Sequence, residues 1–203
     1  MSTNDLIVLS KNFQLVLESG YKDFAQPGLY SIILEQQGNL KTRLFLFDND
    51  ERSLNKVLVP LHNHKYIDEF HYLFGDVVDY CYNLNDRYGI ICKAFKFSRL
   101  SDKEQNPIQD LQFNKVLNLR TTFVNETHII DHLDYHTVCI RKPETAWVIR
   151  ELKENDLYDK SQTCYILPSM NLENFSTTKM TEQDYMRVES ILNKNGYSLG
   201  LSK

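Results

Sequence analysis

Short apolar runs separated by turn-forming residues dominate the middle of the chain. Residues 30–34 form one such run, which stops at Gln36-Gln37-Gly38-Asn39, and residues 40–47 then alternate between apolar and polar positions. Two runs joined by a short polar turn predict a hairpin of antiparallel strands. Similar runs cover residues 57–64, 70–74, 77–82, 89–97, 115–124, 136–140, 146–152 and 163–167. Many short strands at this spacing predict an all-β sandwich or barrel.

Helical periodicity is found near both ends of the chain. Apolar residues between positions 6 and 19 recur at helical spacing, and Gly20 follows them. Near the other end, Thr181 precedes two acidic residues, and an apolar stripe continues to Gly196. Both patterns are typical of amphipathic helices. We therefore predict one domain over residues 1–203, with a β core at about 30–168 and helical extensions at 1–20 and 181–196.

Composition and charge narrow the class of protein. The chain has 203 residues, 42% hydrophobic and 25% charged, which is ordinary for a globular protein. A formal net charge of −4 provides no general attraction to nucleic acid or anionic lipid. The first residues lack a signal-peptide pattern, and no run approaches the roughly 20 apolar residues that span a bilayer. We expect a soluble cytoplasmic protein with free thiols at the four scattered cysteines, Cys81, Cys92, Cys139 and Cys164.

The strongest chemical signal is an H-x-H pair, formed by His62 and His64. Two histidines separated by one residue on an extended segment point to the same face. His136 begins a later apolar run and could return beside them, and Asp68 follows close enough to serve as a fourth ligand. Three imidazoles that leave coordination positions open suit Fe(II), Mn(II), Ni(II) or Zn(II).

The surrounding residues resemble the first metal-binding motif of the cupin superfamily. The match consists of Pro60-Leu61-His62-Asn63-His64, an acidic residue and Leu73-Phe74-Gly75, with His136 in the place of the second-motif histidine. The resemblance implies a double-stranded β-helix, or jelly-roll barrel, with flanking N- and C-terminal helices. Asp68 lies where cupins usually carry glutamate, and Glu69 is one residue late.

Locally, residues 40–152 are similar to the thiol dioxygenases of the plant cysteine oxidase and cysteamine dioxygenase branch. That resemblance implies a non-haem iron dioxygenase acting on a small thiol or similar polar molecule, with Fe(II) as the metal and Ni, Mn or Zn as alternatives. Lys65-Tyr66 replaces the proline-glycine of that branch, whose members bind iron through three histidines and no carboxylate. The alternatives to this function are another cupin enzyme (isomerase, hydrolase or 2-oxoglutarate-dependent hydroxylase) and a non-catalytic ligand-binding cupin. Cupins often form homodimers.

Other polar and aromatic residues have both functional and structural interpretations. Phe70 and Tyr72 share the face of Asp68 and are our predicted substrate-pocket residues. A spacing of four relates His128, His132 and His136, which could make a separate metal site, although two nearby aspartates favour a solvated loop. We assign His71 to packing and no catalytic role to Cys139, because both face away from the predicted ligands. A substrate carboxylate could pair with any of three arginines, which are otherwise sheet-surface charges: Arg43, Arg120 and Arg141.

Overall fold

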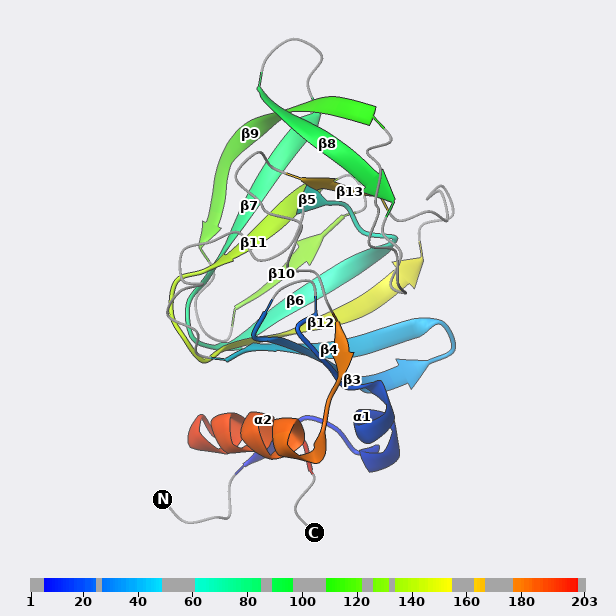
Figure 1. Cartoon of the computed structure of the whole chain (residues 1–203), viewed down its shortest axis with the longest axis vertical. Coiled ribbons are helices and arrows are strands. Elements are labelled where there is room, and N and C mark those ends of the chain that lie inside the picture. Colours follow the sequence, from blue (N-terminus) through cyan, green and yellow to red (C-terminus); the bar gives the residue numbers. More distant parts are fainter. Residues whose placement is uncertain are drawn as a thin grey trace.

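The computed structural model describes residues 6–24, 27–48, 61–84, 89–96, 109–121, 126–131, 134–154, 163–166 and 177–200. Over these residues the protein is mainly β with two helices, and Figure 1 shows how the elements are arranged. In chain order the elements are β1 (Ile7–Val8), α1 (Phe13–Ser19), β2 (Tyr21–Lys22), β3 (Leu29–Gln37), β4 (Leu40–Phe47), β5 (Leu61–His62), β6 (Tyr66–Phe74), β7 (Val77–Leu84), β8 (Ile90–Lys96), β9 (Gln109–Thr121), β10 (Thr127–Ile130), β11 (Tyr135–Ile140), β12 (Thr145–Glu154), β13 (Thr163–Ile166), β14 (Thr178–Lys179), α2 (Glu182–Lys194) and β15 (Tyr197–Ser198).

Two antiparallel sheets contain most of the strands. One sheet has seven strands in the order β10-β6-β12-β4-β3-β2-β14, and six others form a closed ring in the order β11-β5-β13-β8-β9-β7. The expected hairpin is β3 and β4, in which Gln37 pairs with Leu40 across a two-residue turn. Gly38 occupies this turn at a φ of 59°, a conformation that glycine adopts at little cost. The prediction of a mainly β jelly-roll sandwich is confirmed.

The seven-stranded sheet is apolar on both faces, and each face packs on a different layer. On one face, Ile32 of β3 and Leu44 of β4 belong to the same hydrophobic cluster as Val16 of α1 and Val188 of α2. Residues of the opposite face, among them Phe70, Trp147 and Phe47, pack with Val77, Val138 and Ile140 of the six-stranded ring. In Figure 1 the helices lie at the end of the molecule remote from β8 and β9. The helices therefore cover one face of the seven-stranded sheet, and the six-stranded ring packs on the other.

The N-terminal helix is shorter than predicted. Residues 7–8 form β1, a strand parallel to β15, because Ile7 N donates to Gly196 O and Leu9 N to Ser198 O. The helix begins only after Asn12, whose side chain accepts a hydrogen bond from Leu15 N at 3.1 Å. The prediction of helix from residue 6 is therefore wrong for its first part, because pairing with a distant segment overrides the local periodicity.

The second helix matches its prediction closely. Thr181 and Asp184 form a capping box, in which each side chain accepts a hydrogen bond from the backbone N–H of the other residue. Of the strand predicted at 57–64, residues 61–62 form β5, and residues 57–60 lie outside the described part. Among the described residues, no helix is both long and apolar enough to cross a membrane.

Candidate metal centre

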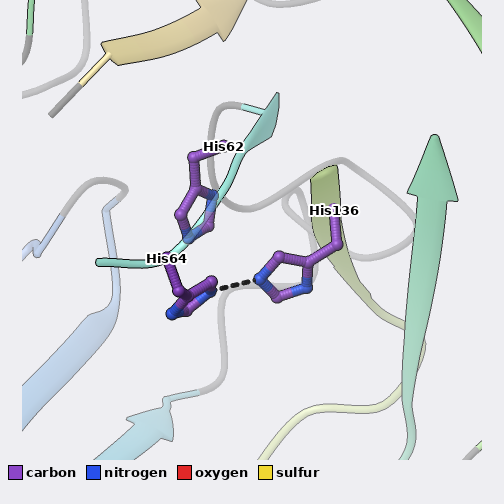
Figure 2. A group of neighbouring side chains, drawn as sticks. All are labelled: His62, His64 and His136. Atoms are coloured by element: carbon purple, nitrogen blue, oxygen red, sulfur yellow. Dashed lines mark hydrogen bonds between the residues drawn. The ribbon is translucent and has the colours of Figure 1, made fainter. Parts of the chain in front are cut away.

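Three histidines meet between the sheets. His62 lies on β5 and pairs with His136 of β11, and His64 follows His62 by two residues. The three ring centroids are each 4.8 Å from the other two, and one nitrogen of each ring lies within 4.8 Å of the others. Figure 2 shows the rings converging from the two segments. The structure thus brings together the three residues that the sequence singled out.

The neighbours of the ring nitrogens indicate which tautomer each ring adopts. His64 Nε2 lies 2.6 Å from His136 Nε2, while the Nδ1 atoms of both rings face carboxylates, Asp68 and Asp79. A carboxylate accepts a proton, so each ring carries its hydrogen on Nδ1 and directs the Nε2 lone pair towards the other ring. Two lone pairs so close repel each other unless a positive charge offsets them, either a shared proton or a cation bound by both nitrogens. With a third imidazole at the same point, this donor set fits a metal cation.

Asp68 approaches the triad from behind His64. Its Oδ2 contacts His64 Nδ1, the nitrogen that faces away from His136. The side chain is buried, and Oδ1 has no hydrogen-bond partner among the described residues. In this position the carboxylate fixes the tautomer and orientation of the ring, as carboxylates behind metal-binding histidines commonly do. A direct bond from Asp68 to the metal stays a prediction.

Asp79 plays the corresponding part for His136, and sequence reasoning missed it. This fully buried carboxylate accepts hydrogen bonds from His136 Nδ1 at 3.2 Å and from the Tyr72 hydroxyl at 3.0 Å. Its second oxygen also lies 3.0 Å from His128 Nε2. Burial alone would raise the pKa of Asp79, but its contacts with His128 and His136 outweigh burial and lower the pKa. The available signal was an acidic residue at an inward-facing position of the apolar run 77–82.

The other candidate histidines lie outside the triad. His128 stacks on Phe70 and on Tyr72, with ring centroids 5.2 and 5.5 Å away, and is therefore part of the packing around Asp79. His132 lies outside the described residues, so a second site including it stays a prediction. His71 contacts the Thr127 hydroxyl on the other face of its strand.

A cavity of about 320 Å³ opens beside the triad. Phe70 lines it, whereas Tyr72 is not among its lining residues and directs its hydroxyl to Asp79. The lining combines apolar and charged side chains, among them Phe24, Phe45, Trp147, Lys41, Arg43, Lys65 and Glu151. This mixture is typical of pockets that bind small polar molecules.

The three candidate arginines differ in position. Arg43 lines the cavity, and Arg141 pairs with Asp76 at the surface. The side chain of Arg120 is outside the described part of the structure. Cys139 is a buried free thiol, and burial raises its pKa, which makes it a poor nucleophile.

No protein-family model and no curated protein matches the chain. Among solved structures, it is similar to KdgF from Halomonas sp., with 14% identity, a TM-score of 0.36, and coverage of 70% of this chain and 94% of KdgF. It is also similar to hydroxypropylphosphonic acid epoxidase from S. wedmorenis, with 8% identity, a TM-score of 0.36, and coverage of 67% and 56%. A third is Streptomyces albus HEPD with 2-hydroxyethylphosphonate and Fe(II) bound, at 9% identity, a TM-score of 0.38, and coverage of 67% and 25%.

The chain thus spans only part of the latter two proteins. At TM-scores below 0.5 these likenesses are remote, and the chemistry of the site follows from its own residues. Fold and site together define a double-sheet β protein with a pocket beside three histidines that could hold a metal ion.

Proposed function

We propose that this chain is a metal-dependent enzyme of the cupin type, in which His62, His64 and His136 bind one divalent transition metal. Fe(II) is the proposed metal, with Ni, Mn and Zn as alternatives. One observation carries the proposal: three imidazole nitrogens cluster at one point, with the Nε2 atoms of His64 and His136 2.6 Å apart, while carboxylates contact the Nδ1 atoms of these two rings. Neutral imidazole with a carboxylate behind it is the usual protein ligand for such metals.

The surrounding residues hold the rings in place and limit access of water. The ring of Phe70 presents an edge-on contact to His64 and to His136, with centroids 5.8 and 5.6 Å apart. Asp68 and Asp79 stop the two rings from turning about their Cβ–Cγ bonds. A donor set whose rings are already held in this way costs little reorganisation when a cation binds.

The proposed reaction is oxidation of a small thiol or similar polar molecule by dioxygen. When bound at three neutral imidazoles, Fe(II) would supply open positions for substrate and dioxygen and would favour an anionic substrate group. The support for this choice is the three-histidine donor set together with the sequence resemblance at residues 60–64 and 73–75. A small-molecule partner, a cytoplasmic location and a homodimer belong to the same proposal.

The test begins with the metal content of the purified full-length protein. We expect one metal per chain in the wild type and its loss in the His62→Ala, His64→Ala double variant. His71→Ala is the matched control, because this histidine lies on the other face of its strand and contacts only Thr127 among the interactions described for its ring. Absence of metal after growth in metal-replete medium would contradict the proposal and favour a ligand-binding module.

Oxygen consumption then distinguishes the reaction classes. Uptake of dioxygen with cysteine or cysteamine, abolished in the double variant, supports the thiol dioxygenase. Metal-dependent turnover of another substrate without oxygen uptake would instead show a different cupin enzyme.

A further inference from the structure

Arg43 places a positive charge deep in the wall of the pocket. It belongs to β4, retains only 9% of its accessible surface, and lines the same cavity as the triad. Its Nη1 donates to Ser31 Oγ at 2.9 Å, and its guanidinium carbon lies 5.7 Å from the centre of the Phe24 ring. These two contacts fix the plane of the guanidinium group. A guanidinium held in this way is well suited to bind a planar or tetrahedral anion through paired N–H groups.

The strand register puts Arg43 at a useful distance from the triad. Ile149 of β12 pairs with Arg43 on one side and with Phe70 on the other. Arg43 and Phe70 therefore lie in one row across the sheet, two strand spacings or about 10 Å apart. Phe70 in turn contacts His64 and His136. A molecule of a few carbon atoms can reach from the guanidinium group to the triad.

The wall near this row is aromatic. Phe45 stacks on Trp147 with ring centroids 5.5 Å apart and an angle of 17° between the planes, and both rings line the cavity. An apolar body would be favoured along this wall, because it leaves water on binding.

With Arg43 included, the lining of the cavity carries three cationic side chains, Lys41, Arg43 and Lys65, and two acidic ones, Asp68 and Glu151. Of these, Lys65 pairs with Glu154 at 2.5 Å. Glu151 of β12 also lines the cavity, and its Oε2 accepts the backbone N–H of Lys41 at 2.8 Å. Burial, followed by the charge of Asp68, raises the pKa of Glu151, while the backbone of Lys41 and the charge of Arg43 act in the opposite direction.

We propose that the pocket takes a small organic acid, whose carboxylate or phosphate group pairs with Arg43, whose apolar part lies along Phe45 and Trp147, and whose reacting end faces the three histidines. The inference rests on the proposed function for the role of the triad, and it narrows the substrate class: an acidic thiol is preferred over a purely cationic one. Binding of the acid by Arg43 does not itself require the metal.

Trp147 is the single tryptophan of the chain, so its fluorescence reports occupation of the pocket. The full-length protein would be titrated with four probes that share a phenyl ring: 3-phenylpropionate, phenyl phosphate, 3-phenylpropionamide and 3-phenylpropylamine. We expect the better of the two acids to bind about tenfold or more tightly than the amide, which is typical of a buried charge-assisted pair. The relative affinity of the two acids identifies the anionic group.

Three variants assign the preference to Arg43. Arg43→Met should bind acid and amide about equally, and Arg43→Lys should retain part of the preference, because lysine keeps the charge without the paired donors. Arg150→Met is the matched control: its side chain is 62% exposed, lies one residue from Ile149 and pairs with Glu69, so its removal should leave all affinities unchanged. Equal binding of acid and amide by the wild type, no saturable acid binding, or tighter binding of the amine would overturn the inference.

The same titration separates this inference from the metal proposal. If the acid preference survives in the His62→Ala, His64→Ala variant and disappears in Arg43→Met, the acid is held by Arg43, whatever the metal content. If the preference instead survives in Arg43→Met and disappears in the histidine variant, the acid binds at the triad and the inference is overturned. Metal analysis of each variant decides the proposed function independently.

Discussion

Replacing Asp79 with asparagine should weaken metal binding although Asp79 touches no metal. The change keeps the shape of the side chain but removes its charge and turns one oxygen into an N–H donor. In the wild type both oxygens face donors: His136 Nδ1 at 3.2 Å, the Tyr72 hydroxyl at 3.0 Å and His128 Nε2 at 3.0 Å. At least one of these contacts must therefore be lost or rearranged.

The expected size of the effect follows from the position of the carboxylate. Residues that hydrogen-bond a metal-binding histidine typically contribute about 10- to 100-fold to metal affinity. Asparagine can still accept the proton of His136 through its remaining oxygen, so the loss should lie near the lower limit, about tenfold or about 1.4 kcal/mol. Because Asp79 is fully buried, this effect should be nearly independent of ionic strength.

The assay is a competition between the metal-free protein and a chromophoric chelator for Zn(II) or Co(II). Asp76→Asn is the matched control, because that carboxylate forms only a partly exposed pair with Arg141 at 3.3 Å and such pairs contribute little. Thermal unfolding in the presence of chelator would show that Asp79→Asn is still folded. An unchanged metal affinity in the folded variant would refute the reasoning, since His136 would then bind without needing its carboxylate.

Three further predictions concern stability. Gly75→Ala should lower the free energy of unfolding, measured in urea, by about 3 kcal/mol or more, because Gly75 has a φ of 95° and an added Cβ would lie 2.5 Å from the Thr145 Cα. Gly38→Ala should lower it by only about 1 kcal/mol, because no atom lies within 4 Å of its added Cβ. Thr181→Ala should cost about 1 kcal/mol by the same measurement, because it removes the cap of α2, and an unchanged midpoint would contradict that role.

The third concerns pH. Burial raises the pKa of Asp184, but hydrogen bonds from Thr181 outweigh burial and lower the pKa below 3.8. The stabilising contribution of Asp184 is therefore present above that pH and is lost as the pH falls through the folded-state pKa. Asp184→Asn should flatten this acid limb of the stability curve, and an unaltered limb would contradict the assignment.

Several features of this protein are determined by local sequence. The alternation at residues 40–47 and the turn at Gly38 specify the β3–β4 hairpin, and Thr181 with Asp184 specifies the start of α2. These features depend on neighbours within a few residues, where backbone geometry has a fixed period. For the same reason the sequence alone places His62 and His64 on one face. Their association with the remote His136 was a prediction from the apolar run that this histidine begins, and the cupin resemblance agreed with it.

Tertiary structure decided the rest of the site. Local periodicity puts Asp79 and Arg43 on inward faces, but only the pairing of β7 with β11 brings Asp79 to His136, and only the register of β4, β12 and β6 brings Arg43 to the cavity of the triad. The pairing of residues 7–8 with 197–198, which shortens the first helix, is likewise invisible in either segment. Register between distant strands depends on burying one whole face of each sheet at once, and no short window of sequence contains that constraint.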